Sequence, residues 1–138
     1  MYKTIVKFTD EEGNSKEKEL RFNLTKAEIA KLQLSTEGGF DKHIQAIIDS
    51  KDNGKIIELF ENLITMSYGQ VDSTGEFYKD KDAARRFLAT EAYSELFMRL
   101  ITDEKEQQAF FMGIIPRDLA SQVEGQIKAN NMSIAEGK

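Results

Sequence analysis

The hydrophobic pattern changes its period near residue 24, and this change constrains the fold more than any other feature. In residues 2–8, the bulky apolar side chains and the lysines fall mainly on opposite sides of an extended chain, and residues 17–22 repeat such an alternation. Alternation with a period of two is typical of a strand with one buried face. Residues 10–15 (DEEGNS) are rich in types that tolerate turns. We therefore predict an N-terminal β-hairpin over residues 2–22.

From Thr25 onward, apolar residues recur at helical spacing. Thr25 and Glu28 form the pattern of a capping box, in which the threonine side chain accepts from the Glu28 backbone N–H and the glutamate side chain reaches back. Polar breaks that contain glycine, at 35–39 and 52–54, separate the successive helices. These signals predict three helices before Gly69, whose left-handed conformation would cap the third.

The longest predicted helix covers about residues 82–101. Its apolar residues span roughly 180° of the helix circumference, which indicates burial on more than one side. They are Ala89, Ala92, Tyr93, Leu96, Phe97, Leu100 and Ile101. The remaining strip is predicted to be solvated and consists of Glu91, Ser94, Glu95 and Arg99. A fifth helix should follow, capped by Thr102 or Asp103 and ending at Gly113.

Together these elements predict an α+β fold, mainly an α-helical bundle, with the β-hairpin packed on it. We expect one globular domain over residues 1–116, with the hairpin at 2–22 and helices at about 25–112. Residues 117–138 are predicted to form a weakly helical or disordered C-terminal tail, because apolar residues thin out there. We find no internal repeat.

Composition excludes several classes of function. The 19 Lys and Arg residues against 24 Asp and Glu residues give a net charge of −5, so the chain lacks the basic surface that nucleic acid binding requires. The absence of cysteine excludes disulfides and thiolate metal sites. No apolar run is long enough to span a membrane, and residues 1–8 lack the features of a signal peptide. We expect a soluble, intracellular protein that binds neither nucleic acid nor membrane.

Candidate metal sites have simpler explanations. Asp49, Lys51 and Asn53 resemble the start of a calcium-binding loop. However, Lys51 places an ammonium group where a carboxylate should coordinate, and Phe60 occupies the position that needs a bidentate glutamate. His43 is the only histidine and has no partner at metal-ligand spacing. We predict no metal site.

Glu91 and Glu95 are the remaining candidates for catalysis. They stand one helical turn apart, as an acid and base pair could, but a solvated helix face is the much better explanation, and no exposed aromatic residue is placed to hold a sugar near them. We therefore predict no catalytic residue and no cofactor, and a protein that is not an enzyme.

The connector before the longest helix, residues 68–80, is unusually rich in large side chains. They are Tyr68, Val71, Phe77 and Tyr78. Exposing them all in a loop is unfavourable, so either they pack on the core or some of them form an interaction surface. The main basic concentration follows and consists of Lys79, Lys81, Arg85 and Arg86. It fits a solvated helix start or a site for an acidic partner.

Several spaced patches of the chain carry a family resemblance. They read SYGxxDSxGxF from Ser67, TEAYSELFMRL from Thr90, GIIPRDL from Gly113, FNLTKAEI from Phe22 and LSTEGG from Leu34. In these patches the chain resembles the tail assembly chaperones of long-tailed phages and prophages of Gram-positive bacteria, over about residues 2–119. It departs from them at Arg99, where the family commonly has a more acidic residue, and in its longer basic run.

The resemblance implies a non-enzymatic, transient assembly factor that coats the tape measure protein, keeps it soluble and helps to recruit tail tube subunits. Self-association along this client is expected. Chaperones of this family are often made in a short form and a frameshift-extended form. The resemblance places the protein in the cytoplasm of the bacterial host and outside the mature virion. The alternative is a structural virion component, such as a head-to-tail connector or a minor tail protein.

The predicted partner-binding residues are aromatic and basic residues from the second half of the chain. They are Phe77, Tyr78, Arg85, Arg86, Phe87, Tyr93, Phe97, Phe110 and Phe111. Within this set, we expect Tyr93 and Phe97 to lie mostly in the core, whereas Phe77, Tyr78 and the basic helix start are the better candidates for contact.

Overall fold

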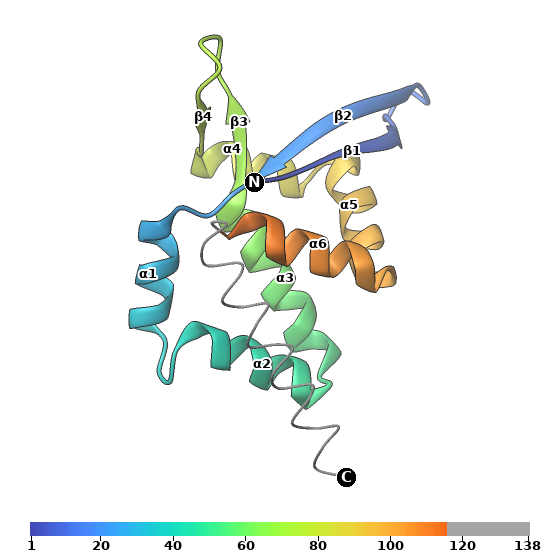
Figure 1. Ribbon diagram of the computed structural model, residues 1–138. Helices are drawn as coiled ribbons and strands as arrows, with labels where there is room; N and C mark the ends of the chain where they lie inside the picture. Colours follow the sequence, from blue (N-terminus) through green and yellow to red (C-terminus); the bar gives the residue numbers. More distant parts are fainter. Residues whose placement is uncertain (116–138) are drawn as a thin grey trace.

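The computed structural model describes residues 1–115 as an α+β fold, which confirms the predicted class. The described residues form six helices and one antiparallel sheet with the strand order β1-β2-β3-β4 (Figure 1). The strands are β1 (Tyr2–Thr9), β2 (Ser15–Phe22), β3 (Tyr68–Val71) and β4 (Phe77–Tyr78). The helices are α1 (Lys26–Ser35), α2 (Phe40–Ser50), α3 (Asn53–Ser67), α4 (Lys81–Leu88), α5 (Glu91–Thr102) and α6 (Glu104–Ile114). The predicted tail, residues 117–138, lies outside the described residues.

Strands β1 and β2 form the predicted N-terminal hairpin. They pair antiparallel, with Tyr2 opposite Phe22 and Thr9 opposite Ser15. The predicted alternation is confirmed, because Tyr2 and Val6 are buried while Lys3 and Lys7 are exposed. The far half of this hairpin projects from the body of the molecule (Figure 1), and the β2 residues before Leu20 are exposed.

The connector after α3 is a second β-hairpin, which the sequence pattern did not predict. Val71 pairs with Phe77, and Gly69 pairs with Arg21 of β2, so this hairpin extends the sheet. The prediction that Gly69 caps α3 in the left-handed conformation is wrong. The chain passes directly from Ser67 into β3, and Gly69 is a strand residue without a positive φ.

The two hairpins close with the same loop chemistry. Asp10 and Asp72 each accept, through one carboxylate oxygen, from the backbone N–H groups two and four residues later, at 2.8 to 3.0 Å. Gly13 and Gly75, three residues after each aspartate, both have a φ of 88°, a conformation that favours glycine. The two loops therefore share a D-x-x-G pattern, and this pattern is the signal that would have revealed the second hairpin.

The longest predicted helix is two helices, α4 and α5. Thr90 lies at the break, where its hydroxyl accepts from the Tyr93 N–H at 3.2 Å and donates to the Phe87 carbonyl oxygen at 2.7 Å. One threonine thus ends the first helix and caps the second. Six of the seven residues of the predicted apolar arc lie in α5, where Ala92, Leu96 and Leu100 are buried, Tyr93 and Phe97 are half-buried and Ile101 is 37% exposed.

Arg99 leaves the predicted solvated strip. Its guanidinium group donates to the Thr4 hydroxyl oxygen at 2.6 Å and to the Ile5 carbonyl oxygen at 3.0 Å. It therefore links α5 to β1, whereas Glu91 and Glu95 are exposed as predicted. A strand distant in the sequence supplies these acceptors, so helical periodicity alone does not predict them.

The remaining helix signals are largely confirmed. Thr25 and Glu28 form the capping box, with hydrogen bonds of 2.9 and 3.2 Å. Asp103 caps α6, which continues one residue past the predicted stop at Gly113. Glycine is needed there for contact rather than for ending the helix, because a Cβ at Gly113 would lie 2.9 Å from the Tyr2 Cβ.

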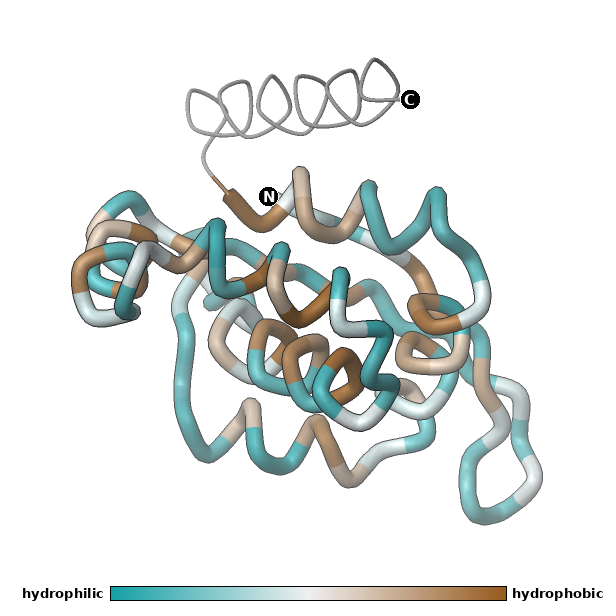
Figure 2. The backbone as a smooth tube through the Cα atoms, turned by 90° about the horizontal axis from the view of Figure 1, so that it is seen from below, coloured by the Kyte–Doolittle hydropathy of each residue, from teal (hydrophilic) through white to brown (hydrophobic). Residues whose placement is uncertain are grey.

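An aromatic cluster joins the sheet to the helices. The Phe22 side chain is 0% exposed, and its ring centroid lies 5.7 to 6.1 Å from those of four other rings. These rings belong to Tyr2, Tyr68, Phe87 and Phe110. The Tyr2 hydroxyl donates to Glu106 at 2.8 Å and links β1 to α6. Figure 2 shows hydrophobic turns of the helices gathered in the interior, with hydrophilic segments outside them.

Candidate functional site

The described part of the chain contains no metal-binding cluster. Within residues 1–115, no group of three or more His, Cys, Asp or Glu residues is placed to hold a metal ion. The calcium-loop-like segment is instead the turn between α2 and α3, where Asp52 caps α3 by accepting from the Lys55 N–H at 3.2 Å. The helices in this range are all too short or too polar to cross a membrane.

The second hairpin presents two of the predicted partner-binding residues. Tyr78 is 42% exposed, and its hydroxyl donates to the Gln70 side chain at 3.2 Å. Phe77 is half-buried, and its ring lies over Gly69 on the neighbouring strand. Val71, 39% exposed, adds an apolar side chain to the same hairpin. The hairpin therefore carries an exposed aromatic and aliphatic surface away from the core.

Helix α4 places its two arginines and its phenylalanine differently. Arg85 and Arg86 are exposed, and Arg85 pairs with Asp82 at 3.2 Å. Phe87 is only 2% exposed, and its ring stacks on the Tyr68 ring at 4.3 Å between centroids. In this structure the arginines are available to a partner, whereas Phe87 is part of the core.

The other predicted aromatic residues divide in the same way. Phe110 is 0% exposed and belongs to the core cluster, while Phe111 is half-buried against Phe60 at 5.1 Å between ring centroids. Tyr93 and Phe97 are half-buried, and their ring centroids lie 5.8 Å apart. Burial first, and then the negative charge of Glu61, raise the pKa of the Tyr93 hydroxyl. The half-buried rings form the border between the core and the exposed residues.

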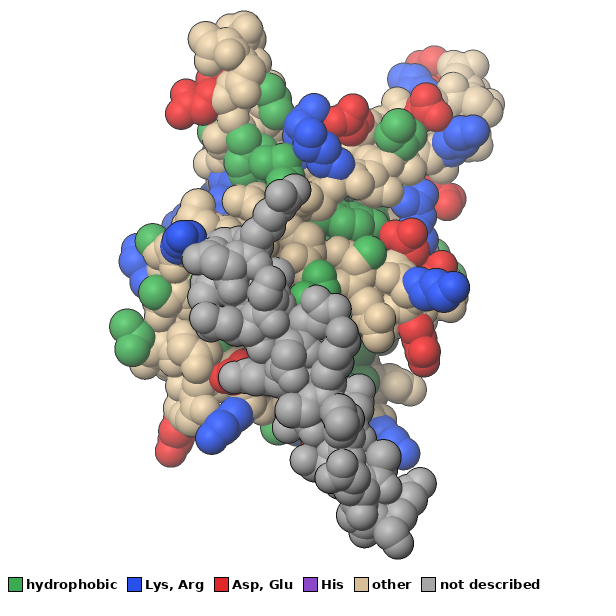
Figure 3. Space-filling view, in the orientation of Figure 1, with side chains coloured by type: hydrophobic (Ala, Val, Ile, Leu, Met, Phe, Trp, Pro, Cys, Tyr) green, Lys and Arg blue, Asp and Glu red, His purple; other side chains and the backbone are tan. Residues whose placement is uncertain are grey.

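The space-filling view shows two projections, the first hairpin and the second hairpin, with hydrophobic side chains gathered below and between them (Figure 3). Charged side chains of both signs lie along the first hairpin (Figure 3). We use the name hairpin surface for the large apolar residues of the second hairpin, of which Phe77 is half-buried, together with the exposed arginines of α4. Its residues are Val71, Phe77, Tyr78, Arg85 and Arg86.

Lys79 lies at the base of this surface, and its role could not be predicted from the sequence. Its ammonium group pairs with Glu28 and donates to the Asn23 carbonyl oxygen at 3.0 Å. Burial opposes ionisation of Glu28, but the hydrogen bonds from Lys79 and from the Thr25 N–H prevail and lower the pKa of the Glu28 carboxyl. The base of the second hairpin is thereby joined to the start of α1.

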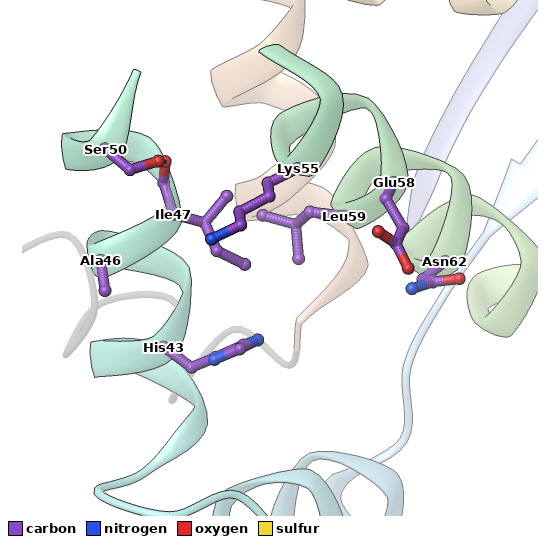
Figure 4. Close-up of a pocket in the computed structure, with 8 residues that line it drawn as sticks. All are labelled: His43, Ala46, Ile47, Ser50, Lys55, Glu58, Leu59 and Asn62. Atoms are coloured by element: carbon purple, nitrogen blue, oxygen red, sulfur yellow. The ribbon is translucent and has the colours of Figure 1, made fainter. Parts of the chain in front are cut away.

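A groove lies between α2 and α3. It encloses about 450 Å³, and in Figure 4 His43 and Ile47 point from α2 toward α3 while Lys55 and Leu59 point back. A second hollow of about 340 Å³ adjoins it, where Leu32, Phe40 and Met66 line the wall. His43 is exposed and borders both hollows. We did not predict this groove, because it depends on how α2 is placed against α3.

The carboxylates of the hairpin loops and of α1 give an expected pH dependence. Hydrogen bonds from the Asn14 backbone to Asp10 and from the Thr74 hydroxyl to Asp72 lower the pKa of each carboxyl, as described above for Glu28. A carboxyl with a lowered pKa stabilises the fold above its unfolded pKa and loses this contribution as the pH falls through its folded pKa. We expect the free energy of unfolding to decrease below about pH 5.

Urea denaturation across this pH range measures the effect. Asp72→Asn is the matched variant, because the amide oxygen can still accept hydrogen bonds but no longer titrates. Its free energy of unfolding should depend less steeply on pH than that of the unaltered chain. An identical slope would contradict the role assigned to Asp72.

A family model covers almost the whole chain. It describes a phage tail assembly chaperone and matches residues 1–136. The chain belongs to this family. The match confirms the resemblance seen in the sequence patches, while the Gram-positive origin stays a prediction. No curated protein and no solved structure matches the chain.

The assignment defines the setting in which the chaperone acts. A tail assembly chaperone acts in the host cell during assembly and interacts with tail proteins. Membership in a chaperone family also favours a non-enzymatic role.

Proposed function

We propose that this chaperone binds the tape measure protein and keeps it soluble during tail assembly. The family match over residues 1–136 carries this proposal. The exposed aromatic and aliphatic side chains of the second hairpin support it, because a chaperone that shields apolar client segments needs apolar surface of its own. The net charge of −5 would help to keep the complex in solution.

The hairpin surface is the proposed client contact. Tyr78 and Val71 are exposed, and Phe77 forms the border with the core. Aromatic residues and arginines contribute much of the binding energy in many protein interfaces. Arg85 and Arg86 would add hydrogen bonds or ion pairs to acidic residues of the client. Phe87 and Phe110 would support the surface from within the core rather than contact the client.

Co-expression with the tape measure protein tests the function directly. The proposal expects the tape measure protein to be insoluble when expressed alone, and soluble and bound to the chaperone when the two are expressed together. A tape measure protein that stays insoluble in the presence of the folded chaperone would contradict the proposal.

Replacing Tyr78 tests the proposed contact. Tyr78→Ala is expected to weaken binding to a purified tape measure fragment about tenfold, because an exposed aromatic contact is lost. Titration calorimetry measures the affinity, and circular dichroism checks that the fold is retained. Met98→Ala is the matched control, since Met98 is an exposed apolar residue of α5, 54% exposed, outside the hairpin surface. Equal weakening by both variants would argue against the hairpin surface.

We further propose that the chaperone self-associates along its client, recruits tail tube subunits and is absent from the mature virion. Analytical ultracentrifugation with and without the tape measure protein tests self-association, and co-purification tests recruitment of the tube subunit. Mass spectrometry of purified particles tests the last point. Finding the chain there at the copy number of a tail component would favour a structural virion component instead.

A further inference from the structure

Helices α1 and α2 are attached to the molecule more weakly than the other helices. Neither has a buried residue, whereas α3, α4, α5 and α6 each bury two or more. Their inward apolar side chains are only half-buried and are Ile29, Leu32, Phe40, Ile44 and Ile47. Segments with few buried apolar contacts open at a lower free energy than the core does.

The two helices are tied to one another. Gln33 of α1 accepts from the Phe40 N–H at 2.9 Å and donates to Asp41 at 3.1 Å, and both of these residues begin α2. One glutamine side chain thus bridges the turn between α1 and α2. If one helix moves relative to the core, the other is expected to move with it.

The chain on either side of this pair is anchored to other elements of the fold. Leu24 is 1% exposed and its N–H donates to the Ile114 carbonyl oxygen at 2.6 Å. At the other end, Lys51 adopts a left-handed φ of 56°, and Asp52 caps α3. Residues 25–51 can therefore move without releasing the sheet or α3.

The Lys79 side chain holds α1 against the core from a distant part of the chain. It comes from the junction of β4 and α4 and meets Glu28, 51 residues earlier, in the first turn of α1. The two side chains are 21% and 36% exposed, so the pair is partly shielded from water. Water screens a partly shielded pair less than it screens a fully exposed one.

We propose that α1 and α2 form a hinged lid over the apolar face of α3, and that the Lys79–Glu28 ion pair is its latch. In the closed state, Leu59 and Leu63 of α3 are buried and the α2–α3 groove remains as the seam of the lid. Opening exposes these leucines together with the inner side of α1 and α2. The latch thereby regulates how much apolar surface the molecule presents, and the inference does not depend on which client it binds.

Thiol labelling tests the lid, because the natural chain has no cysteine. Leu63→Cys places one thiol beneath the lid, and Leu96→Cys places one in the core of α5, where Leu96 is 0% exposed. Adding Lys79→Met should raise the labelling rate of the L63C thiol about fivefold, the factor that a loss of about 1 kcal/mol makes in an equilibrium. The labelling rate of the L96C thiol should not change. Equal acceleration of both thiols, or of neither, would overturn the proposal.

Hydrogen exchange gives a second readout without a cysteine. In the unaltered chain, backbone amides of α1 and α2 should exchange faster than those of α5, and Lys79→Met should accelerate only the former. Lys81→Met is the matched control, because it removes an exposed lysine two residues away. If Lys81→Met accelerates exchange in α1 and α2 as much as Lys79→Met does, the latch is excluded.

Discussion

Phe22→Ala is expected to destabilise the fold by about 3–5 kcal/mol, the largest effect of any single truncation that we predict. The Phe22 ring is 0% exposed and contacts rings from β1, β3, α4 and α6. Removing it leaves a cavity where the sheet meets the helices, and the surrounding rings cannot close it without shifting separate elements. Small domains are commonly stable by only about 5–15 kcal/mol, so this loss is a large fraction of the total.

Urea denaturation followed by circular dichroism measures this loss. Phe8→Ala is the matched control. Phe8 lies on the same face of the first hairpin as Phe22, but it is nearer the projecting end and only half-buried. It should cost much less than Phe22→Ala. If Phe22→Ala does not fold, Phe22→Leu retains most of the volume and should fold with a smaller loss. Two results would contradict the central role of Phe22. One is a Phe22→Leu variant as stable as the unaltered chain, and the other is a loss of stability for Phe8→Ala as large as that for Phe22→Ala.

Gly69→Ala is expected to lower the free energy of unfolding by about 1–3 kcal/mol and to displace the Phe77 ring from its position over residue 69. An added Cβ would collide with the Phe77 ring and would lie 2.8 Å from the Tyr78 carbonyl oxygen. The ring can move, but the backbone oxygen of the paired strand cannot do so without weakening the pairing of β3 with β4. Because Tyr78 belongs to this hairpin, client binding should fall as well.

A second substitution separates the steric cause from other effects. In the Gly69→Ala background, Phe77→Ala should recover part of the lost stability, since it removes the colliding ring, and the double-mutant cycle measures this coupling. Gly54→Ala is the control. Gly54 lies in the first turn of α3, and a Cβ added there would approach no atom closer than 3.4 Å. Alanine at this position should therefore be neutral or stabilising. If the stability losses of Gly69→Ala and Phe77→Ala simply add in the double variant, the predicted collision is excluded.

The correct sequence predictions depended on signals that lie close together in the chain. The alternation in β1 requires only that one face of the strand be buried, and the capping box at Thr25 joins residues three positions apart. Periodicity and caps report on the backbone conformation of a few adjacent residues. For the same reason, the D-x-x-G loop of the second hairpin was available in the sequence, and it matches the loop of the first.

The burial of the aromatic residues could not be predicted from such local signals. Phe87 and Tyr93 have similar apolar character and lie six positions apart, but one is in the core and the other is half-buried, because α4 and α5 run along different axes. A one-helix interpretation keeps the arrangement of residues within α5 but places α5 incorrectly relative to α4, because the helix breaks at Thr90. The division of the predicted partner-binding residues between surface and core therefore required the tertiary structure.

The sequence by itself determined the class of fold, the first hairpin, most helix boundaries and, through its motif patches, the family. The tertiary structure decided which rings face a partner, that Arg99 bonds to β1, and that Lys79 reaches Glu28 beneath the second hairpin. The physical reason is the range of the interactions. Hydrophobic period and helix capping act over a few residues, whereas burial and ion pairing depend on which distant segments the folded chain brings into contact.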